Sequence, residues 1–535
     1  MLTGSQRTIT SAAVLIALGF LGSRLLGALR AVVIANEFGA SAELDAFFVA
    51  QRLPELTFQL LAGATLASAF IPVYARYISR RGEDEAWRLA SIVLNFVLLA
   101  TIAFAVVMLI FAEWIVPAMA PGLGEDSGLQ EELRDDAIFL TRVMLVSPIL
   151  FAVSGMITGI LNARRHFLLP AIAPMMYNLA IIVGALALSD RFGVEALAIG
   201  VIVGSGLHLI IQLPALFASG ARFLPSLNLR DPGVREVLRL MGPRMIGLAA
   251  AQINLIVLTF FASFVGDTSI SALNFAWLIL LFPVGMFGMA LAMAMFPALA
   301  ERAAEGGGRE VRVMIGQALR FTLFLSVPAG VGLILLREPL VRALLEHGAF
   351  DAAASDLVAD VLLFYAIALF AHTAIEILSR GFYALSDTRT PVTFAVAAML
   401  VNIVLAAALV GPLEVQGLAL ALSIATMVEA LGLFIVLHRR LGFELWTRKM
   451  ATTVFRIVIA TALMAEAVGV VLLILDDGGN FGPRSFFALL VGTVVGAVVY
   501  YAATLIMRLD EAQLVAVRIQ AFLPGGPSRA SPPLR

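Results

Sequence analysis

Fourteen long apolar stretches set the first limit on what this chain can fold into. A helix needs about 20 mainly apolar residues to cross roughly 30 Å of hydrocarbon. Hydrophobic residues make up 61% of the 535 positions and charged residues 14%, against about 45–50% and 25% in soluble domains. So few charges cannot cover so much apolar surface in water. We therefore predict an all-α, polytopic membrane protein with about fourteen transmembrane helices. The stretches lie near 9–35, 45–75, 88–112, 137–161, 167–189, 194–218, 238–265, 270–299, 313–336, 357–384, 391–411, 415–437, 451–475 and 485–507.

The loops between these stretches differ in their content of basic residues. The internal loops after even-numbered stretches hold sixteen Arg or Lys residues, and loops after odd-numbered stretches hold five. Because Arg and Lys accumulate in cytoplasmic loops, both termini are predicted to be cytoplasmic. The net charge of −1 creates no field that would attract nucleic acid. The absence of cysteine excludes disulfides and thiolate metal sites.

A repeat of about 220 residues runs through the sequence. The segment GSRLLG at 22–27 recurs as GPRMIG at 242–247, and FIP at 70–72 finds a partner in MFP at 295–297. Each copy holds six helices, an even number, so the two copies share one orientation in the membrane. The sequence therefore predicts two pseudo-symmetric six-helix lobes around a central cavity, followed by two C-terminal helices.

The repeat also sets the expected domain boundaries. Two segments, at the linker and near the C-terminus, combine apolar residues with Arg at a helical spacing, which predicts amphipathic helices on the inner membrane surface. The expected parts are an N-lobe at 1–220, an interfacial amphipathic linker at 221–236, a C-lobe at 237–440, helices 13 and 14 at 441–508, and an amphipathic and disordered cytoplasmic tail at 509–535.

Several arginines occupy positions where a charge is costly. Arg24 lies about 22 Å along the first helix at 1.5 Å per residue, and Arg30 follows one and a half turns later. A charge in hydrocarbon costs at least about 2.5–3.5 kcal/mol, so such residues usually face water or a partner. Guanidinium groups present a rigid bidentate fork that suits phosphate. The pattern favours anion binding, for example of a phosphorylated or pyrophosphorylated substrate.

The two arginines of the first helix point about 120° apart on an ideal helix, so a bend is needed for both to face one cavity. We expect the glycines at 19, 22 and 27 to permit that bend. In the second helix Asp45 and Arg52 add further charges. Glu55 follows Arg52 by three residues, so the two side chains either form a buried structural pair or belong to the binding site.

The tenth apolar stretch carries a polar stripe. His372, Glu376 and Arg380 are spaced four residues apart and lie on one helix face. Because histidine titrates near neutral pH, the stripe could act as a proton-sensitive gate. The alternative is a polar ladder that stabilises packed helices, and the sequence favours this second reading.

Several motifs together resemble the MurJ (MviN) family of lipid II flippases, within the multidrug/oligosaccharidyl-lipid/polysaccharide exporter superfamily. The motifs are SRLLG at 23–27, DAFFVA at 45–50, AFIP at 69–72, GILNA at 159–163, AP at 173–174, QIN at 252–254 and YALSDTRTP at 383–391. The resemblance implies alternating access and arginines of helices 1, 2 and 8 that hold a diphosphate. It places Arg24 and Arg30 on the helix 1 positions and Arg52 on a basic position of helix 2. Asp45 matches an acid near the outer end of helix 2.

The chain also departs from this family pattern. Where the family carries charges in helix 8, this sequence has Trp277, Leu278 and Leu281, and a typical Asp-Arg of helix 7 is replaced by Leu258 and Thr259. The second lobe thus lacks most of its expected charge. The departures put the helix 8 diphosphate contact and a helix 7 sodium site in question.

The leading hypothesis is a flippase of the bacterial cytoplasmic (inner) membrane. It would move undecaprenyl-pyrophosphate-linked peptidoglycan precursor (lipid II) to the outer leaflet, with no catalytic residues and no cofactor. The energy would come from the membrane potential or an ion gradient. Expected partners are lipid II or a related glycan lipid, the phospholipid bilayer, and proteins of cell-wall synthesis or division. The alternatives are an exporter of another lipid-linked glycan or amphiphilic drug, and a non-transporting membrane scaffold.

Overall fold

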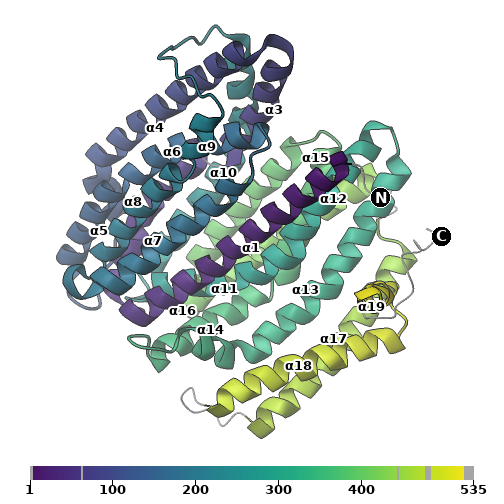
Figure 1. Ribbon diagram of the computed structural model, residues 1–535. Helices are drawn as coiled ribbons and strands as arrows, with labels where there is room; N and C mark the ends of the chain where they lie inside the picture. Colours follow the sequence, from purple (N-terminus) through teal and green to yellow (C-terminus); the bar gives the residue numbers. More distant parts are fainter. Residues whose placement is uncertain (1–3, 62–63, 443–444, 476–482, 523–535) are drawn as a thin grey trace. The chain divides into compact units, whose positions relative to one another are not determined.

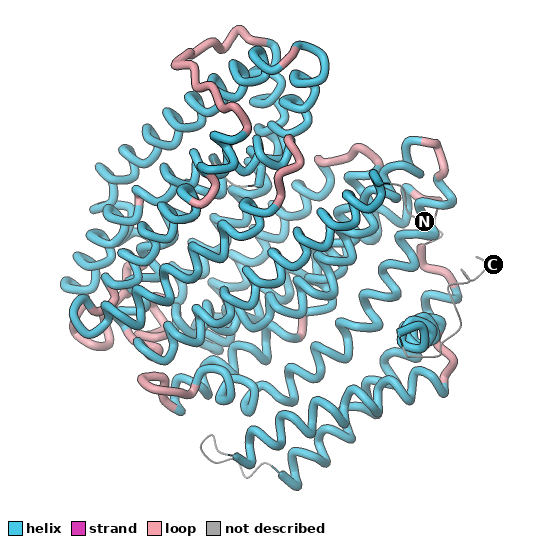
Figure 2. The backbone as a smooth tube through the Cα atoms, viewed as in Figure 1, coloured by secondary structure: helices cyan, strands magenta, loops and turns pink. Residues whose placement is uncertain are grey.

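A computed structural model describes residues 4–61, 64–442, 445–475 and 483–522 of the chain. All regular secondary structure in this described part is helical, with loops between the helices and no strand (Figure 2). The first ten helices are α1 (Gly4–Phe38), α2 (Ala42–Leu61), α3 (Ala64–Arg81), α4 (Glu83–Met119), α5 (Gln130–Met144), α6 (Val146–Ala163), α7 (Leu168–Phe192), α8 (Glu195–Ile210), α9 (Leu213–Ala218) and α10 (Pro232–Ala262). The remaining elements are α11 (Ser269–Pro283), the π-helical segment η1 (Val284–Met289), α12 (Ala290–Ala304), α13 (Gly308–Leu345), α14 (Ala352–Ala366), α15 (Leu369–Ala384), α16 (Arg389–Arg440), α17 (Arg448–Leu475), α18 (Pro483–Ile506) and α19 (Asp510–Phe522).

Many of these helices can cross a membrane. Within the described residues, nine helices are long and apolar enough to span, or up to eleven if each of two bent pairs counts as one span. This finding confirms the all-α, polytopic fold class. The count of about fourteen stays a prediction. Two predicted stretches, 391–411 and 415–437, fall within the single element α16, which is interrupted by one non-helical residue, Glu414.

The internal repeat is visible in the backbone itself. The turn after α6 contains Arg165 with a φ of 64°, and the turn after α15 contains Ser386 with a φ of 60°. These positions are 221 residues apart, the same offset found in the sequence. The backbone hydrogen bonds of the two turns also correspond: His166 donates to the carbonyl of Leu161, and Asp387 donates to the carbonyl of Phe382.

A second pair of repeated positions has an unusual backbone conformation. Gly193 ends α7 with a φ of 53° and a ψ of −137°, and Glu414 breaks α16 with a φ of 50° and a ψ of −136°. These residues are again 221 apart. Glycine adopts this region freely, whereas a side chain there is strained by roughly 1–3 kcal/mol. The second copy of the repeat therefore retains the backbone turn at a cost in conformational strain.

Replacing Glu414 with glycine is expected to stabilise the protein, because it removes this strain and Glu414 is exposed. A gain of about 1 kcal/mol in unfolding free energy is expected. The matched change, Gly193→Ala, should destabilise by a similar amount. Thermal unfolding of the purified protein in detergent measures both. A lower melting temperature for Glu414→Gly would contradict the interpretation.

The helices form two compact units. Unit 1 comprises Met1–Phe275, Leu345–Ala354 and Ile403–Leu418, and unit 2 comprises Ala276–Leu344, Ser355–Asn402 and Ala419–Arg535. Unit 1 thus contains α10, which follows the predicted linker. The lobe boundaries expected from the repeat stay a prediction, because the compact units do not test them.

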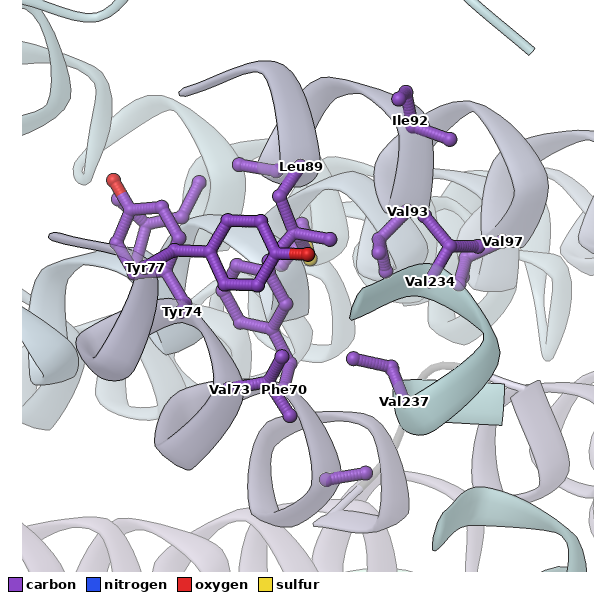
Figure 3. Packing of buried hydrophobic residues seen from close by; sticks show 14 of the residues in the cluster. Phe70, Val73, Tyr74, Tyr77, Leu89, Ile92, Val93, Val97, Val234 and Val237 are labelled. Carbon is purple, nitrogen blue, oxygen red and sulfur yellow. The ribbon is translucent and has the colours of Figure 1, made fainter. Parts of the chain in front are cut away.

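A buried apolar cluster fixes α10 within unit 1. Phe70 and Tyr74 of α3 stack with ring centroids 5.0 Å apart, and Tyr74 meets the Trp87 ring of α4 edge-on. Val234 and Val237 of α10 complete the cluster and are fully buried (Figure 3). The cluster joins residues of α3 and α4 to residues of α10 that lie more than 130 positions later in the sequence.

The linker between α9 and α10 differs from its prediction. Residues 221–231 are not helical, so the helical spacing of apolar and basic residues at 221–236 was misleading for most of that segment. The linker is pinned to α4 instead: Leu224 donates its amide to Ser91 Oγ at 3.0 Å, and Asn95 Nδ2 donates to the carbonyl of Ser226 at 3.0 Å. Asp231 then caps α10 through the amides of Gly233 and Val234. These side chains satisfy backbone groups that a helix would have satisfied internally.

The described C-terminal part of unit 2 consists of three helices. Helices α17 and α18 lie side by side (Figure 1), and α19 occupies most of the predicted amphipathic segment. Arg320 of α13 forms a 3.0 Å ion pair with Glu511 of α19, and both side chains are largely buried. Tyr500 of α18 donates its hydroxyl to the carbonyl of Phe324 at 2.6 Å. The predicted tail beyond residue 522 lies outside the described residues.

Candidate functional site

The glycines of α1 pack against α7. A Cβ atom at Gly19 would lie 2.5 Å from the Cβ of Ala171, and one at Gly22 would lie 3.0 Å from Met175 Cε. The structure therefore gives these two glycines a role other than the expected bend, because no larger side chain fits between the helices. Asn178 of α7 strengthens this contact by donating Nδ2 to the carbonyl of Ser23 at 3.4 Å.

The two arginines of α1 are half-buried. Arg30 places its guanidinium carbon over the ring of Tyr177 on α7, 5.9 Å from the centroid. Gln51 and Glu55 of α2 also lie near Tyr177. The predicted residues Arg30 and Glu55 are therefore both neighbours of a tyrosine that the sequence did not single out.

Arg52 makes hydrogen bonds to other helices of unit 1. Its Nε donates to Thr259 Oγ1 on α10 at 3.1 Å, and one terminal nitrogen donates to Asn274 Oδ1 on α11 at 3.1 Å. Asn274 is itself oriented by a 2.7 Å bond to the carbonyl of Ile270. Sequence reasoning did not place Thr259 and Asn274 in the site: Asn274 gave no signal beyond its polarity within an apolar stretch, and Thr259 was noted only as a departure from the family pattern. Both acceptors are neutral groups that orient the guanidinium.

Asp45 caps the start of α11 from a different helix. Its carboxylate accepts the amide of Ser271 at 2.7 Å and the amide of Ile270 at 3.2 Å, and it also accepts the hydroxyl of Ser271. The side chain is only 1% exposed. The first amides of a helix have no partner within the helix, and a carboxylate at this end is favoured by the helix dipole. Asp45 therefore joins the start of α2 to the start of α11.

Two further contacts lie in the loops near these helix ends. Asp267, between α10 and α11, accepts the amide of Gly124 at 3.1 Å and the amide of Ser127 at 2.9 Å. The amide of Ala349, after α13, donates to the carbonyl of Asn36 at the end of α1 at 2.8 Å. With the Asp45 cap they form what we call the loop-side closure, defined by Asp45, Asp267 and Ala349.

The predicted polar stripe of α15 belongs to unit 2. Glu376 and Arg380 form an ion pair at 3.5 Å. The His372 ring meets Trp277 edge-on at a centroid distance of 5.3 Å, and Trp277 meets Tyr365 in the same way at 5.6 Å. Where the resembled family carries charge in helix 8, this chain therefore packs an aromatic ring against the stripe. The arrangement suits a packed ladder, and its role in gating stays a prediction.

The other positions at which this chain lacks a charge typical of the resembled family differ in burial. Leu258 of α10 is buried, whereas Leu278 and Leu281 of α11 are half-buried. No cluster of three or more His, Asp or Glu side chains suited to a metal ion occurs in the part of the chain that the structure describes.

A titratable group in the loop between α15 and α16 is tied to its surroundings. Burial alone would raise the pKa of Asp387, but hydrogen bonds from Thr390 and the charge of Arg440 outweigh it and hold the pKa below its ordinary value. Thr390 Oγ1 donates to Asp387 Oδ2 at 2.6 Å, and Arg440 lies 2.6 Å from the same carboxylate. The motif at 383–391 thus has a structural role, because it fixes the start of α16.

The fold and these sites define a class of protein, a multi-pass membrane transporter built from a helical repeat. A solved inward-facing multidrug resistance MATE family transporter of the MOP superfamily has the same fold, with a TM-score of 0.66 and 17% identity over 79% of this chain and 95% of that one. The solved lipid II flippase MurJ in an inward closed conformation is more similar. Its TM-score is 0.77, with 25% identity over 94% of this chain and all of that chain.

Sequence comparisons agree with the structural ones. The family model for lipid II flippase MurJ matches residues 34–492. The lipid II flippase MurJ of Burkholderia cenocepacia is 33% identical over 424 residues, which cover 78% of this chain and 81% of that protein. The probable lipid II flippase MurJ of Vibrio cholerae is 31% identical over 477 residues, covering 87% and 89%. The chain belongs to the lipid II flippase MurJ family, a family of transporters in the bacterial inner membrane.

Proposed function

We propose that this protein moves lipid II from the inner to the outer leaflet of the cytoplasmic membrane. The observation that carries the proposal is membership of the lipid II flippase family over residues 34–492, joined to three arginines on α1 and α2, two helices of a single unit. The experiment that tests it is replacement of these arginines in cells that depend on the protein, with lipid II export as the readout.

In this proposal Arg24, Arg30 and Arg52 hold the pyrophosphate of the lipid. Each guanidinium can donate two parallel hydrogen bonds to phosphate oxygens. Arg52 is already oriented by Thr259 and Asn274, so less side-chain freedom is lost when the anion binds. Binding of the pyrophosphate then does not require a charge at Trp277, Leu278 or Leu281, where the resembled family has its helix 8 contact.

The loop-side closure would control release. Its contacts, made by Asp45, Asp267 and Ala349, join helix ends and loops of the first repeat copy to those of the second. For a lipid headgroup to leave between these helix ends, the contacts would have to break. The polar stripe His372, Glu376 and Arg380 supports the packing of α15 in this mechanism. Energy would come from the membrane potential or an ion gradient, because the sequence carries no nucleotide-binding loop.

We further propose that both termini are cytoplasmic and that the linker at 221–236 lies on the inner membrane surface. The excess of Arg and Lys in loops after even-numbered stretches supports the orientation. The exposed side chains of Phe223, Leu227 and Leu229 beside Arg222 and Arg230 support the interfacial linker.

Because the chain has no cysteine, single introduced cysteines can report the orientation. Glu125→Cys is expected to react with a membrane-impermeant maleimide in intact spheroplasts. Ala304→Cys should react only after the membrane is permeabilised. Both residues are exposed, so burial does not limit their labelling. The opposite labelling pattern would reverse the assigned orientation.

A further inference from the structure

Arg30 rests on an aromatic ring that is held from two sides. The ring of Tyr177 lies 5.9 Å from the guanidinium carbon, within the range of a cation–π interaction. Gln51 of α2 lies beside Tyr177. The tyrosine thus contacts α1 through its ring and lies next to α2, the two helices that carry the three proposed arginines.

Two further helices, α6 and α8, pack against Tyr177. Phe151 of α6 meets it edge-on, with centroids 5.2 Å apart and an interplanar angle of 71°. Gly204 of α8 approaches so closely that a Cβ atom there would lie 2.9 Å from Tyr177 Cδ2 and 2.9 Å from its carbonyl oxygen. This close approach requires glycine. The ring therefore has little room to move away from Arg30.

A buried hydrogen-bonded group holds Phe151 in turn. The ring of His208 meets Phe151 edge-on at 5.2 Å, and His208 Nδ1 lies 2.6 Å from Ser154 Oγ. Gln212 Nε2 donates to the same hydroxyl at 2.8 Å. Ser154 and Gln212 are fully buried, and a satisfied polar group of this kind is rigid. Contacts therefore continue without a break from this group to Arg30.

The geometry of a cation–π contact explains why the ring would matter. Where a ring stacks on a guanidinium it covers a face of that group, whereas phosphate binds at the edge through N–H groups in the guanidinium plane. A stacked arginine can therefore hold the ring and the anion together.

We propose that Tyr177 is a positioning residue that holds the edge of the Arg30 guanidinium toward the diphosphate of the lipid. The proposal rests on the proposed function, because it assumes that Arg30 contacts the substrate. It assigns no chemistry to Tyr177 itself. The residue acts through Arg30, and Phe151 with the His208 group keeps it in place.

The test uses the full-length protein in nanodiscs and undecaprenyl pyrophosphate as the binding probe. Tyr177→Leu is expected to weaken binding about tenfold, in line with the loss of a desolvated cation–π contact. Tyr177→Phe keeps the ring and should stay within about threefold of the wild type. The double variant Arg30→Ala/Tyr177→Leu should bind no more weakly than Arg30→Ala, because a residue that acts only through Arg30 has nothing left to position.

The control for stability is Tyr500→Leu, which removes a buried tyrosine of unit 2 with its own hydrogen bond to Phe324. It should lower the melting temperature without changing affinity for the probe. If Tyr177→Leu does not fold, Tyr177→Met replaces the ring with an unbranched side chain that fills the space. Wild-type affinity in folded Tyr177→Leu or Tyr177→Met would overturn the positioning role. A double variant in which the separate losses of affinity multiply would overturn it as well. Wild-type affinity in Arg30→Ala would instead overturn the proposed contact of Arg30 with the substrate.

Discussion

Replacing Arg24 with alanine is expected to abolish complementation of a flippase-depleted strain while the protein still reaches the membrane. Hydrogen bonds to charged groups contribute about 1.5–3 kcal/mol each, so the loss of one bidentate arginine should reduce transport by about 10- to 100-fold or more. Arg24→Lys should retain part of the activity, since lysine keeps the charge but lacks the planar fork. Growth under depletion and lipid II export measure the effect.

The matched control is Arg456→Ala. Arg456 also lies on a membrane helix, α17, but it is exposed and belongs to unit 2. It should support normal growth. Full complementation by Arg24→Ala at normal expression would remove Arg24 from the binding site, whereas equal loss in both variants would point to a general effect of removing membrane arginines.

Replacing Asp45 with alanine is expected to weaken the loop-side closure and to reduce transport at least tenfold. The carboxylate holds two amides and one hydroxyl at the start of α11. Leaving a buried donor unsatisfied costs about 1–3 kcal/mol per group. The state with an intact loop-side closure should therefore lose most of its free-energy advantage over a state in which the closure is broken. Asp45→Asn keeps one acceptor oxygen and should have an intermediate effect.

Hydrogen–deuterium exchange measures this directly, because the amides of Ile270 and Ser271 are the groups that lose their partner. They should exchange faster in Asp45→Ala, and the interior of α11 should change less. Asp190→Ala, which removes an exposed acid from α7, is the control and should leave exchange at α11 unchanged. Unaltered protection of the first turn of α11 in Asp45→Ala would show that the cap does not hold the closure together.

The sequence was a good guide wherever the signal was local or periodic. Apolar stretches predicted a polytopic helical protein, and the offset of 221 recurs in the backbone at Arg165 and Ser386 and again at Gly193 and Glu414. These features depend on helix length and on turn geometry, which short segments encode. The pairing of Glu376 with Arg380 is of the same kind, since four residues separate them on one helix.

The site was less accessible to sequence reasoning, because its contacts join distant segments. Arg52 bonds to Thr259 and Asn274, more than 200 residues away, and hydrophobic periodicity carries no information about such pairs. Tyr177 looked like one aromatic residue among many. The glycines of α1 were ambiguous as well, since a bend and a close helix contact both require a missing side chain, and only the position of α7 decides between them.

The most direct test of the account is a leaflet-accessibility assay for lipid II in cells whose only flippase is this protein. An external reagent that modifies lipid II in the outer leaflet should find abundant substrate in wild-type cells. It should find little within minutes of depletion, or in cells that carry Arg24→Ala, while lipid II accumulates in the inner leaflet. Undiminished exposure of lipid II in depleted cells would contradict the proposal that this protein carries the lipid across the membrane.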